Sequence, residues 1–367
     1  MIFDLQDDIM ALLVDVPAEV FDPRYETIYL PTLVRGTFRW IRSGLAFTLT
    51  HHYFLSFLAS TRPKIVLTII DNNRALYTAR MASADEEARF VIFQNGNRLL
   101  SEFPSQKSLL PGDVFFCLTD AYVEPLKGSV AGDALIVPSG SLASKLHKLH
   151  DLPISQGNTA GYISNWRQGS MLEGELWVTD NHGAAVPHCK FYKPEIDLLQ
   201  PLLQSIQSLG MTLEIIGASS DNRSEEYFFY ESILGKEGWS FSPRIGKERS
   251  YSKIRLYPIL FCVDSTLGYE ALSGLKRVIF LDASSGGENR APFGYPSNLE
   301  LANSPLHLRN EALRSWKSQI AQVVSMNDPD FTVLADSIVG QAAISIRLVD
   351  LSQIVRAILR PGFNGGS

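Results

Sequence analysis

Short apolar runs that end in polar or glycine-containing turns recur through the first half of the chain. The run PKIVLTII (residues 63–70) is apolar and rich in β-branched side chains, which is typical of a strand covered on both faces. Three further runs end in the same way, in the segments ARFVIFQNG, GDVFFCLTD and GDALIVPSG. Helix-like segments follow these turns at roughly regular spacing. This alternation predicts parallel βα units.

A second series of α/β elements begins near residue 190. It opens with KPEIDLLQPLLQSIQSLG, which predicts an amphipathic helix with a proline near its start and a glycine at its end. The apolar runs MTLEII, LFCV and RVIFL predict strands, and SEEYFFYESILG predicts a helix with acids in its first turn. The second half therefore repeats the α/β pattern of the first.

The break between the two series divides the chain. We assign AGYISNWRQGS as the last strand of the first series and residues 169–188 as a connection. The predicted fold class is α/β, with one domain over residues 1–189 and a second over residues 190–340. Residues 341–367 are predicted as a C-terminal helix and a disordered tail.

Composition and charge limit the class of partner. The 367 residues carry a formal net charge of −6, which argues against nucleic acid, because nucleic-acid proteins usually show a basic excess. The three cysteines, Cys117, Cys189 and Cys262, form no CxxC pair. Cys117 and Cys262 sit inside apolar runs, and together these features predict buried thiols in a reducing cytoplasm, and neither disulfides nor a zinc site.

The most membrane-like stretch is SGLAFTLTHHYFLSFLAS, residues 43–60, which directly follows the basic segment RGTFRWIR. It is short for a transmembrane span and is interrupted by His51 and His52. An interfacial helix is one interpretation, and a buried helix of a domain is the favoured one. The N-terminal residues contain acids where a signal peptide needs lysine or arginine.

Candidate ligand-binding residues are those that follow strands, because ligands of doubly wound sheets bind outside the carboxyl ends of the strands. In the first half these residues are Asp71–Asn73, Gln94–Gly96, Asp120 and Ser139–Ser141. In the second half they are Gly217–Ser219, Asp264–Thr266 and Asp282.

The stretch LFCVDSTLGYEAL combines a strand, a hydroxyl-bearing turn and a helix. Ser265 and Thr266 lie at the predicted helix N-terminus, where backbone N–H groups and the helix dipole favour a phosphate. Glu270 lies one turn further on and can accept hydrogen bonds from a ribose, while Gly268 permits close approach. The other interpretation is an ordinary N-cap made by Asp264 or Ser265.

We assign the predicted donor site to the residues of this turn and to the glycine after the neighbouring strand: Gly217, Asp264, Ser265, Thr266, Gly268 and Glu270. Neither a Walker A sequence nor a G-x-G-x-x-G motif follows a predicted strand, so an ATPase or a simple NAD enzyme is not supported.

The strand-end residues of the first half are the candidates for catalysis. Asp71 is predicted to act as a general base or as a nucleophile, and Asn95 to position the substrate. Asp120 is the second acid at a strand end. The other interpretation is that Asp71 caps the next helix and that Asn95 belongs to an ordinary turn.

Other polar pairs have simpler interpretations. Asp328 and Asp330 form a D-x-D, but they follow no apolar strand, so a helix cap is favoured over a metal site. Of Glu225 and Glu226, one can face the cleft and the other solvent, but the favoured interpretation is two acids in the first turn of a helix. His188 and the pair in LHKLHDL lack the pattern of a metal site.

Five segments taken together resemble the bacterial surface carbohydrate biosynthesis proteins of O-antigen and capsule: PKIVLTIIDNN, RFVIFQNG, GYISNW, EEYFFYE and CVDSTLGYEALSGLKRVIFLD. A similar serine/threonine turn and glutamate-bearing helix occur in GT-B glycosyltransferases and in CDP-glycerol glycerophosphotransferases, where the turn holds the donor phosphate and the glutamate holds the ribose. The resemblance implies these roles for Ser265, Thr266 and Glu270. It also implies two Rossmann-like domains facing a cleft, with the last helix returning to the first domain.

The resemblance implies a cytoplasmic, metal-independent glycosyltransferase that needs no cofactor. Its partners would be a nucleotide-sugar donor and a saccharide or lipid-linked saccharide acceptor, with peripheral contact at the inner face of the membrane as a further expectation. Three alternatives stay open: transfer of glycerophosphate from a CDP-polyol, epimerisation of a sugar nucleotide, and nucleotide binding without catalysis.

Overall fold

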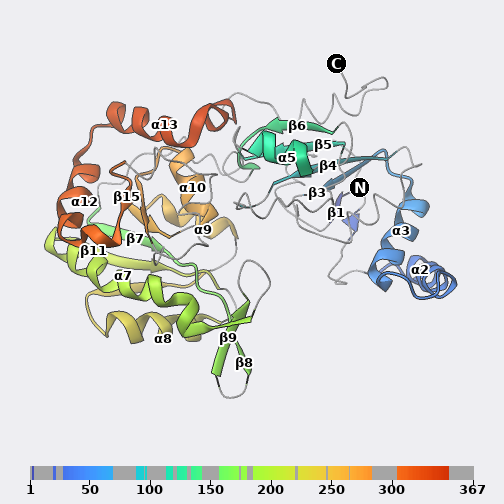
Figure 1. The fold of residues 1–367 in the computed structure, drawn as a ribbon, viewed down its shortest axis with the longest axis horizontal. Helices are drawn as coiled ribbons and strands as arrows, with labels where there is room; N and C mark the ends of the chain where they lie inside the picture. Colours follow the sequence, from blue (N-terminus) through green and yellow to red (C-terminus); the bar gives the residue numbers. More distant parts are fainter. Residues whose placement is uncertain are drawn as a thin grey trace. The chain divides into compact units, whose positions relative to one another are not determined.

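A computed structural model gives the fold of the chain (Figure 1). It describes residues 2–3, 20–21, 28–68, 88–94, 96, 113–118, 122–129, 134–142, 157–172, 175–179, 185–219, 222–244, 247–263, 265–282 and 304–346.

The chain forms two compact units. The first contains Met1–Gly96, Phe103–Leu142 and Ser345–Ser367, and the second contains Asn97–Glu102 and Ala143–Ile344. The predicted boundary between residues 189 and 190 is therefore wrong, because the second unit already begins near residue 143. Most of the predicted helix and tail at 341–367 lies outside the described residues.

The first unit contains a parallel sheet of six strands. Their order is β2-β1-β3-β4-β5-β6. The strands are β1 (Ile2–Phe3), β2 (Val20–Phe21), β3 (Ile65–Thr68), β4 (Arg89–Phe93), β5 (Val114–Cys117) and β6 (Leu135–Pro138). Every residue of β3 and β5 is buried, which explains why these strands have continuous apolar sequences. The four predicted strands of this half are confirmed, whereas the two-residue strands β1 and β2 were not predicted.

Two helices precede β3 in the first unit, α2 (Leu30–Arg42) and α3 (Leu49–Thr61), and α5 (Val123–Ser129) precedes β6. Thr48 caps α3 by accepting a hydrogen bond from the backbone N–H of His51. Residues 51–58 of α3 are all buried, so the favoured interpretation of the apolar stretch as a buried helix is confirmed. None of the described helices has the length and hydropathy needed to cross a membrane.

The second unit contains another parallel sheet of six strands, in the order β12-β11-β7-β13-β14-β15. The strands are β7 (Thr159–Ile163), β11 (Thr212–Ile216), β12 (Trp239–Ser242), β13 (Leu260–Cys262), β14 (Val278–Leu281) and β15 (His307–Leu308). In chain order this is 3-2-1-4-5-6, the strand order of dinucleotide-binding Rossmann domains. The order reverses between β7 and β13, and ligands of such sheets bind at that reversal.

The strand within AGYISNWRQGS is real, but it belongs to the second unit. Ala160 pairs with Leu213 of β11, and Tyr162 pairs with Phe261 of β13. Our assignment of this strand to the first half was therefore wrong. An apolar run predicts a strand from local sequence, and it carries no information about the sheet in which the strand finds its partners.

The helices of the second unit cover both faces of its sheet. They are α7 (His188–Ser208), α8 (Arg223–Leu234), α9 (Lys247–Ile254), α10 (Thr266–Ser273), the 3₁₀ helix η4 (Asn310–Ser315), α12 (Trp316–Ser325) and α13 (Asp328–Ile346). Figure 1 shows α7 and α8 together on one side of the sheet, with α9 and α10 on the other.

The connection predicted at residues 169–188 contains a small antiparallel sheet. Its strands are β8 (Ser170–Leu172), β9 (Glu175–Thr179) and β10 (Ala185–Pro187). The cysteines Cys117 and Cys262 are buried as predicted, while Cys189 is exposed on α7. All three are free thiols.

Candidate functional site

Three loops of the second unit follow adjacent strands at the carboxyl edge of its sheet. Ser164–Arg167 follows β7, Gly217–Ser219 follows β11, and the turn at Ser265 joins β13 to α10. Because parallel strands point the same way, these loops meet on either side of the point where the strand order reverses. This edge is the candidate ligand site.

The turn after β13 leaves the side chain of Ser265 out of the helix cap. Ser265 has the extended backbone of an N-cap residue, but its hydroxyl makes no capping hydrogen bond to α10. The interpretation of Ser265 as an ordinary side-chain cap is therefore wrong. Ser265 and Thr266 are half-buried at the helix N-terminus, where a phosphate would be favoured. Asp264 lies outside the described residues.

Gly268 lets α10 pack closely on β13. A Cβ atom at this position would lie 2.3 Å from Sγ of Cys262. A larger residue would push the helix away from the strand and move the turn that precedes it. Gly268 therefore has a packing role in the described structure. The close approach expected at Gly268 is that of Cys262 in β13.

Glu270 is buried, with 6% of its surface exposed. Its Oε2 accepts a hydrogen bond of 2.8 Å from the hydroxyl of Tyr251, which comes from α9. Side chains of a helix lean toward its N-terminus, so the carboxylate lies over the first turn of α10. Glu270 and Ser265 thus belong to the same end of the same helix.

A second glutamate holds the loop after β11. Glu226 is fully buried, and its carboxylate accepts hydrogen bonds from the backbone N–H groups of Ala218 at 2.8 Å and Ser219 at 3.0 Å. It also accepts one from the hydroxyl of Ser164 at 2.6 Å, which links the β7 and β11 loops. Glu225 is exposed and both acids lie in the first turn of α8, so the favoured interpretation as acids of a helix first turn is confirmed.

Gly217 is required by this arrangement. A Cβ atom at Gly217 would lie 3.1 Å from Oε2 of Glu226 and 3.2 Å from the carbonyl oxygen of Ser242. The glycine thus lets β11 end close to the Glu226 carboxylate. Its predicted role in donor binding is indirect in this geometry, since the space above it is filled by the protein.

Buried hydroxyls extend the Glu226 contacts below the site. The hydroxyl of Tyr230 donates to Oγ of Ser164 at 2.8 Å and lies 3.4 Å from Oε1 of Glu195, to which Tyr162 also donates. Burial, followed by the charge of Glu195, raises the pKa of both tyrosines well above the ordinary value. Both therefore remain neutral donors at physiological pH and fix the positions of the two carboxylates.

Two contacts at this edge were missed by the sequence-based assignment. The backbone N–H of Arg167 donates to the hydroxyl of Tyr192 at 2.6 Å, and that hydroxyl donates to the carbonyl of Asn165 at 3.1 Å, which fixes the loop after β7. Arg244 follows β12, and its guanidinium donates to the carbonyl of Ala218 at 3.1 Å. A basic residue two positions after the strand WSFS was the signal that could have identified this cation.

At the far side of the same edge, Asp282 follows β14 as predicted. Its Oδ2 lies 3.8 Å from Nε2 of the buried His307 in β15. The strand-end position of Asp282 is thus confirmed. Its strand, β14, is separated by β13 from the point between β7 and β13 where the strand order reverses.

The catalytic candidates of the first unit, Asp71, Asn95 and Asp120, lie outside the described residues. Their neighbour Gln94 is buried at the end of β4. Its amide donates to the carbonyl of Gly96 at 2.9 Å and accepts from the backbone N–H of Leu118 at 3.0 Å. Gln94 therefore joins the ends of β4 and β5.

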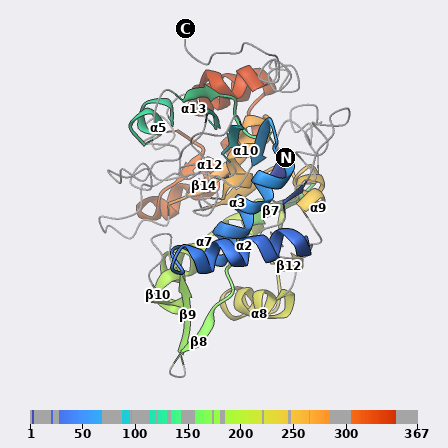
Figure 2. The ribbon, with the colours of Figure 1, turned by 90° about the vertical axis from the view of Figure 1, so that its right-hand side faces the viewer.

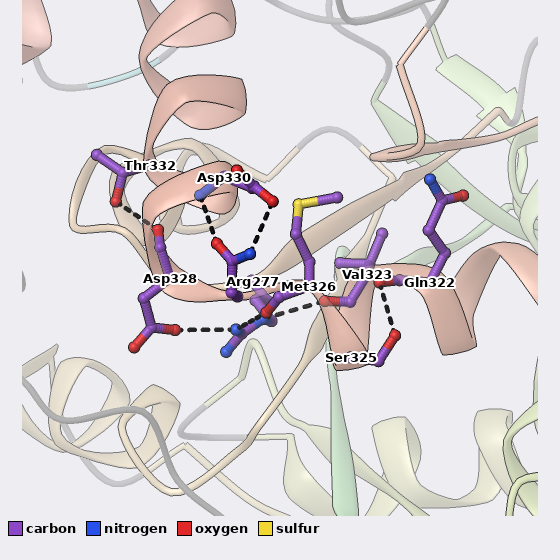
Figure 3. A network of polar contacts seen from close by, with 9 residues as sticks. Arg277, Gln322, Val323, Ser325, Met326, Asp328, Asp330 and Thr332 are labelled. Atoms are coloured by element: carbon purple, nitrogen blue, oxygen red, sulfur yellow. Dashed lines mark hydrogen bonds and ion pairs between the residues drawn. The ribbon is translucent and has the colours of Figure 1, made fainter.

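The D-x-D pair forms a helix terminus, as predicted (Figure 3). At the start of α13 the side-chain amide of Asn327 accepts a hydrogen bond from the backbone N–H of Asp330 at 2.8 Å and donates one to the Asp330 carboxylate at 2.7 Å, so Asn327 caps the helix. Asp328 pairs with the buried Arg277 at 3.0 Å. Arg277 also donates to the carbonyl oxygens of Val323 and Met326, so these residues connect α12, α13 and β14.

His188 is a packing residue of the second unit. Its ring is buried and packs against Tyr192 and Phe229. Burial lowers its pKa, so it is a neutral packing residue. The pair in LHKLHDL lies outside the described residues, and no group of three or more potential metal ligands occurs among the residues that the structure describes.

The comparison with protein families decides the classification. The family described as "putative O-antigen biosynthesis protein" matches residues 91–338, which is more than half of the chain. The chain belongs to this O-antigen biosynthesis family. The matched residues include the loops after β7 and β11, which Glu226 holds, and the whole turn from β13 to α10. The match confirms the resemblance seen in the sequence.

Solved structures show the fold of this O-antigen biosynthesis protein. It resembles a "putative UDP-N-acetylglucosamine 2-epimerase" from Listeria monocytogenes, with a TM-score of 0.57 and 13% identity over 97% of this chain and 88% of the other. It also resembles the UDP-GlcNAc 2-epimerase from Neisseria meningitidis bound to UDP-GlcNAc, with a TM-score of 0.54 and 14% identity over 96% and 87%. These enzymes have the GT-B fold, so the predicted GT-B-like α/β class is confirmed. No curated protein sequence matches the chain.

Proposed function

We propose that this protein is a glycosyltransferase that moves a sugar from a nucleotide-activated donor to a growing surface polysaccharide or glycolipid. The observation that carries the proposal is the geometry after β13, where a Ser265 hydroxyl that makes no capping hydrogen bond lies at a helix N-terminus and Glu270 is buried on the same helix, beside the reversal of strand order. Membership in the O-antigen biosynthesis family supports the same class of substrate.

In this proposal the donor binds along the carboxyl edge of the second sheet. The diphosphate is held by the first turn of α10, with the hydroxyls of Ser265 and Thr266 as additional donors. Glu270 accepts hydrogen bonds from the ribose hydroxyls. The hydrogen bond from Tyr251 to Oε2 holds the Glu270 side chain in one rotamer. Less side-chain entropy of Glu270 is therefore lost when the ligand binds.

Arg244 adds a positive charge on the other side of the site. It is half-buried at the end of β12, and one of its N–H groups is bound to the carbonyl of Ala218. A guanidinium has five donors, so four remain for other contacts. A partly buried arginine fixed in this way suits the second phosphate of a nucleoside diphosphate.

The chemical step is assigned to the first unit. The reaction breaks the bond between the anomeric carbon and the phosphate oxygen, forms a bond to an acceptor hydroxyl oxygen, and moves the hydroxyl proton to a base. Asp71 is proposed as that base or as a nucleophile, with Asn95 positioning the substrate. The proposal is for a cytoplasmic enzyme that works on a saccharide or lipid-linked saccharide acceptor and contacts the membrane peripherally.

Epimerisation of a sugar nucleotide is the second candidate. The solved structures with TM-scores above 0.5 include three whose names give UDP-N-acetylglucosamine 2-epimerase, one of them as putative, and the likeness covers 96–97% of this chain. An epimerase would use the same nucleotide site without needing an acceptor.

Reaction analysis with UDP-, GDP-, dTDP-, CDP- and CMP-activated sugars separates the two candidates. With acceptor extract present, a glycosyltransferase should release free nucleotide in proportion to the sugar transferred. Without acceptor it should leave the donor largely intact.

Conversion of the donor to its epimer without acceptor would show that the protein is an epimerase and would contradict the proposed glycosyltransferase. Release of a nucleoside monophosphate from a CDP-polyol would point to glycerophosphate transfer. Nucleotide binding with no conversion of any donor under either condition would leave only a binding role.

A further inference from the structure

The surface of α2 and the turn after it is unusually apolar. Fourteen large apolar side chains are exposed in the described part of the chain. Eight of them fall within a stretch of twenty residues: Ile28, Tyr29, Leu30, Val34, Phe38, Ile41, Leu45 and Phe47. Several are more than half exposed, with Phe38 at 70%, Leu30 at 66% and Phe47 at 64%. Exposed apolar side chains gathered in this way mark an interaction surface.

The exposed apolar side chains of α2 share one face. With 3.6 residues per turn, each residue rotates the helix by about 100°, so four of these side chains fall within an arc of about 80°. They are Leu30, Val34, Phe38 and Ile41. Figure 2 shows the helix α2 beside α3. Thr32 and Gly36 on the opposite face of α2 are buried, and a Cβ atom at Gly36 would lie 2.7 Å from Cα of Tyr53 in α3. This tight crossing holds α2 with its apolar face outward.

The turn between α2 and α3 extends the same surface. Leu45 and Phe47 are exposed, and both have left-handed backbone angles, with φ of 63° and 61°. Bulky residues seldom adopt this conformation. The indole of Trp40 donates to the carbonyl of Phe47, and His52 lies 2.7 Å from the carbonyl of Ala46, so the turn is fixed on both sides.

Positive charge borders the apolar face. Arg42, Arg35 and Arg39 occupy the next arc of about 60° around α2. Residues 27–70 contain five lysines and arginines and no aspartate or glutamate, although the chain as a whole carries a net charge of −6. A helix with an apolar face and an adjoining cationic face fits the boundary between the headgroups and acyl chains of an anionic bilayer.

We propose that α2 and its turn, from Ile28 to Phe47, dock on the surface of an anionic lipid bilayer. The apolar face enters the headgroup boundary, and the three arginines bind lipid phosphates and lie along the surface. This surface shares only the turn at residues 43–47 with the membrane-like stretch of residues 43–60, since residues 51–58 of α3 are buried. The inference rests on the surface itself and does not depend on the nucleotide site.

The test is co-sedimentation of the full chain with vesicles. Vesicles of phosphatidylcholine mixed with phosphatidylglycerol should bind the protein, and vesicles of phosphatidylcholine alone should bind it much less. Each Arg→Gln change at positions 35, 39 and 42 should weaken binding to the anionic vesicles about fivefold, since a basic residue near such a surface contributes about 1 kcal/mol. Phe38→Glu should weaken binding more than tenfold, because it removes apolar contact and adds repulsion.

Phe228→Glu is the matched control, because Phe228 is exposed to a similar extent on α8, at 61%. It should leave vesicle binding within about twofold of the unchanged chain, as an exposed substitution away from the surface. Equal loss in Phe38→Glu and Phe228→Glu, or no binding to anionic vesicles by the unchanged chain, would overturn the proposal. The proposal would also be overturned if the unchanged chain did not bind vesicles and light scattering showed that Phe38→Glu converts a dimer to a monomer. A second copy of the chain would then cover this face. Nucleotide affinity, measured on the same variants, should stay unchanged and reports separately on the donor site.

Discussion

Replacing Asp71 by asparagine is expected to lower turnover about 10²–10⁴-fold while changing nucleotide affinity by no more than about twofold. The expected loss is the usual contribution of a positioned general base. Asparagine has nearly the same size and can still accept a hydrogen bond, but it cannot take the acceptor's proton or form a glycosyl ester. The assay is the rate of sugar transfer at saturating donor, with nucleotide affinity measured by calorimetry.

The position of β3 supports this choice of residue. All four residues of β3 are buried, and the strand lies between β1 and β4 inside the first sheet, as the apolar sequence predicted. Asp71 follows this central strand by three residues in sequence. Asp120→Asn is the comparison variant, because Asp120 follows β5 of the same sheet by three residues, with β4 lying between β3 and β5. Near-normal turnover in Asp71→Asn together with loss in Asp120→Asn would move the role to Asp120, and unfolding of Asp71→Asn would make Asp71 a structural cap.

Glu226→Ala is expected to lower the free energy of unfolding by about 3–5 kcal/mol. The carboxylate is fully buried and receives three hydrogen bonds, two from backbone N–H groups of the β11 loop and one from Ser164. Hydrogen bonds to a charged group contribute about 1.5–3 kcal/mol each, and the donors left behind lose their partner inside the protein. The cost therefore exceeds that of a simple truncation.

Urea unfolding followed by circular dichroism measures this difference. Glu225→Ala is the matched control, since Glu225 is the preceding residue on the same helix and is exposed. It should change the free energy by no more than about 0.5 kcal/mol. If the two variants were equally stable, the Glu226 contacts would not hold the β11 loop.

Local sequence predicted the strands and the α/β class well. The runs that became β3, β4, β5, β13 and β14 are apolar because nearly all of their residues are buried, so burial on both faces can be read from the sequence. The pattern also located Ser265 and Glu270 at a strand-to-helix turn. These features depend on neighbouring residues in the chain.

Features that depend on distant residues were not predicted. The strand at Thr159–Ile163 was placed in the wrong half, because its partners lie far away in the sequence: β11 begins about 50 residues later and β13 about 100 residues later. The three hydrogen bonds of Glu226 also join three separate segments, so the sequence showed only two acids in a first turn. The apolar face of α2 was overlooked in the same way, since only packing against α3 shows which face of the helix is covered.

Titration calorimetry of Glu270→Ala with the tightest-binding nucleoside diphosphate tests the central claim, that the turn from β13 to α10 holds the donor nucleotide. The variant should lose about 1–3 kcal/mol of binding free energy, which is a rise of about five- to 150-fold in Kd, because a charged acceptor is removed from the ribose. Tyr251→Phe is the control: it removes the hydroxyl that binds Glu270 but keeps the carboxylate, so most of the affinity should remain. An unchanged Kd in a folded Glu270→Ala variant would contradict the assignment of this turn as the donor site.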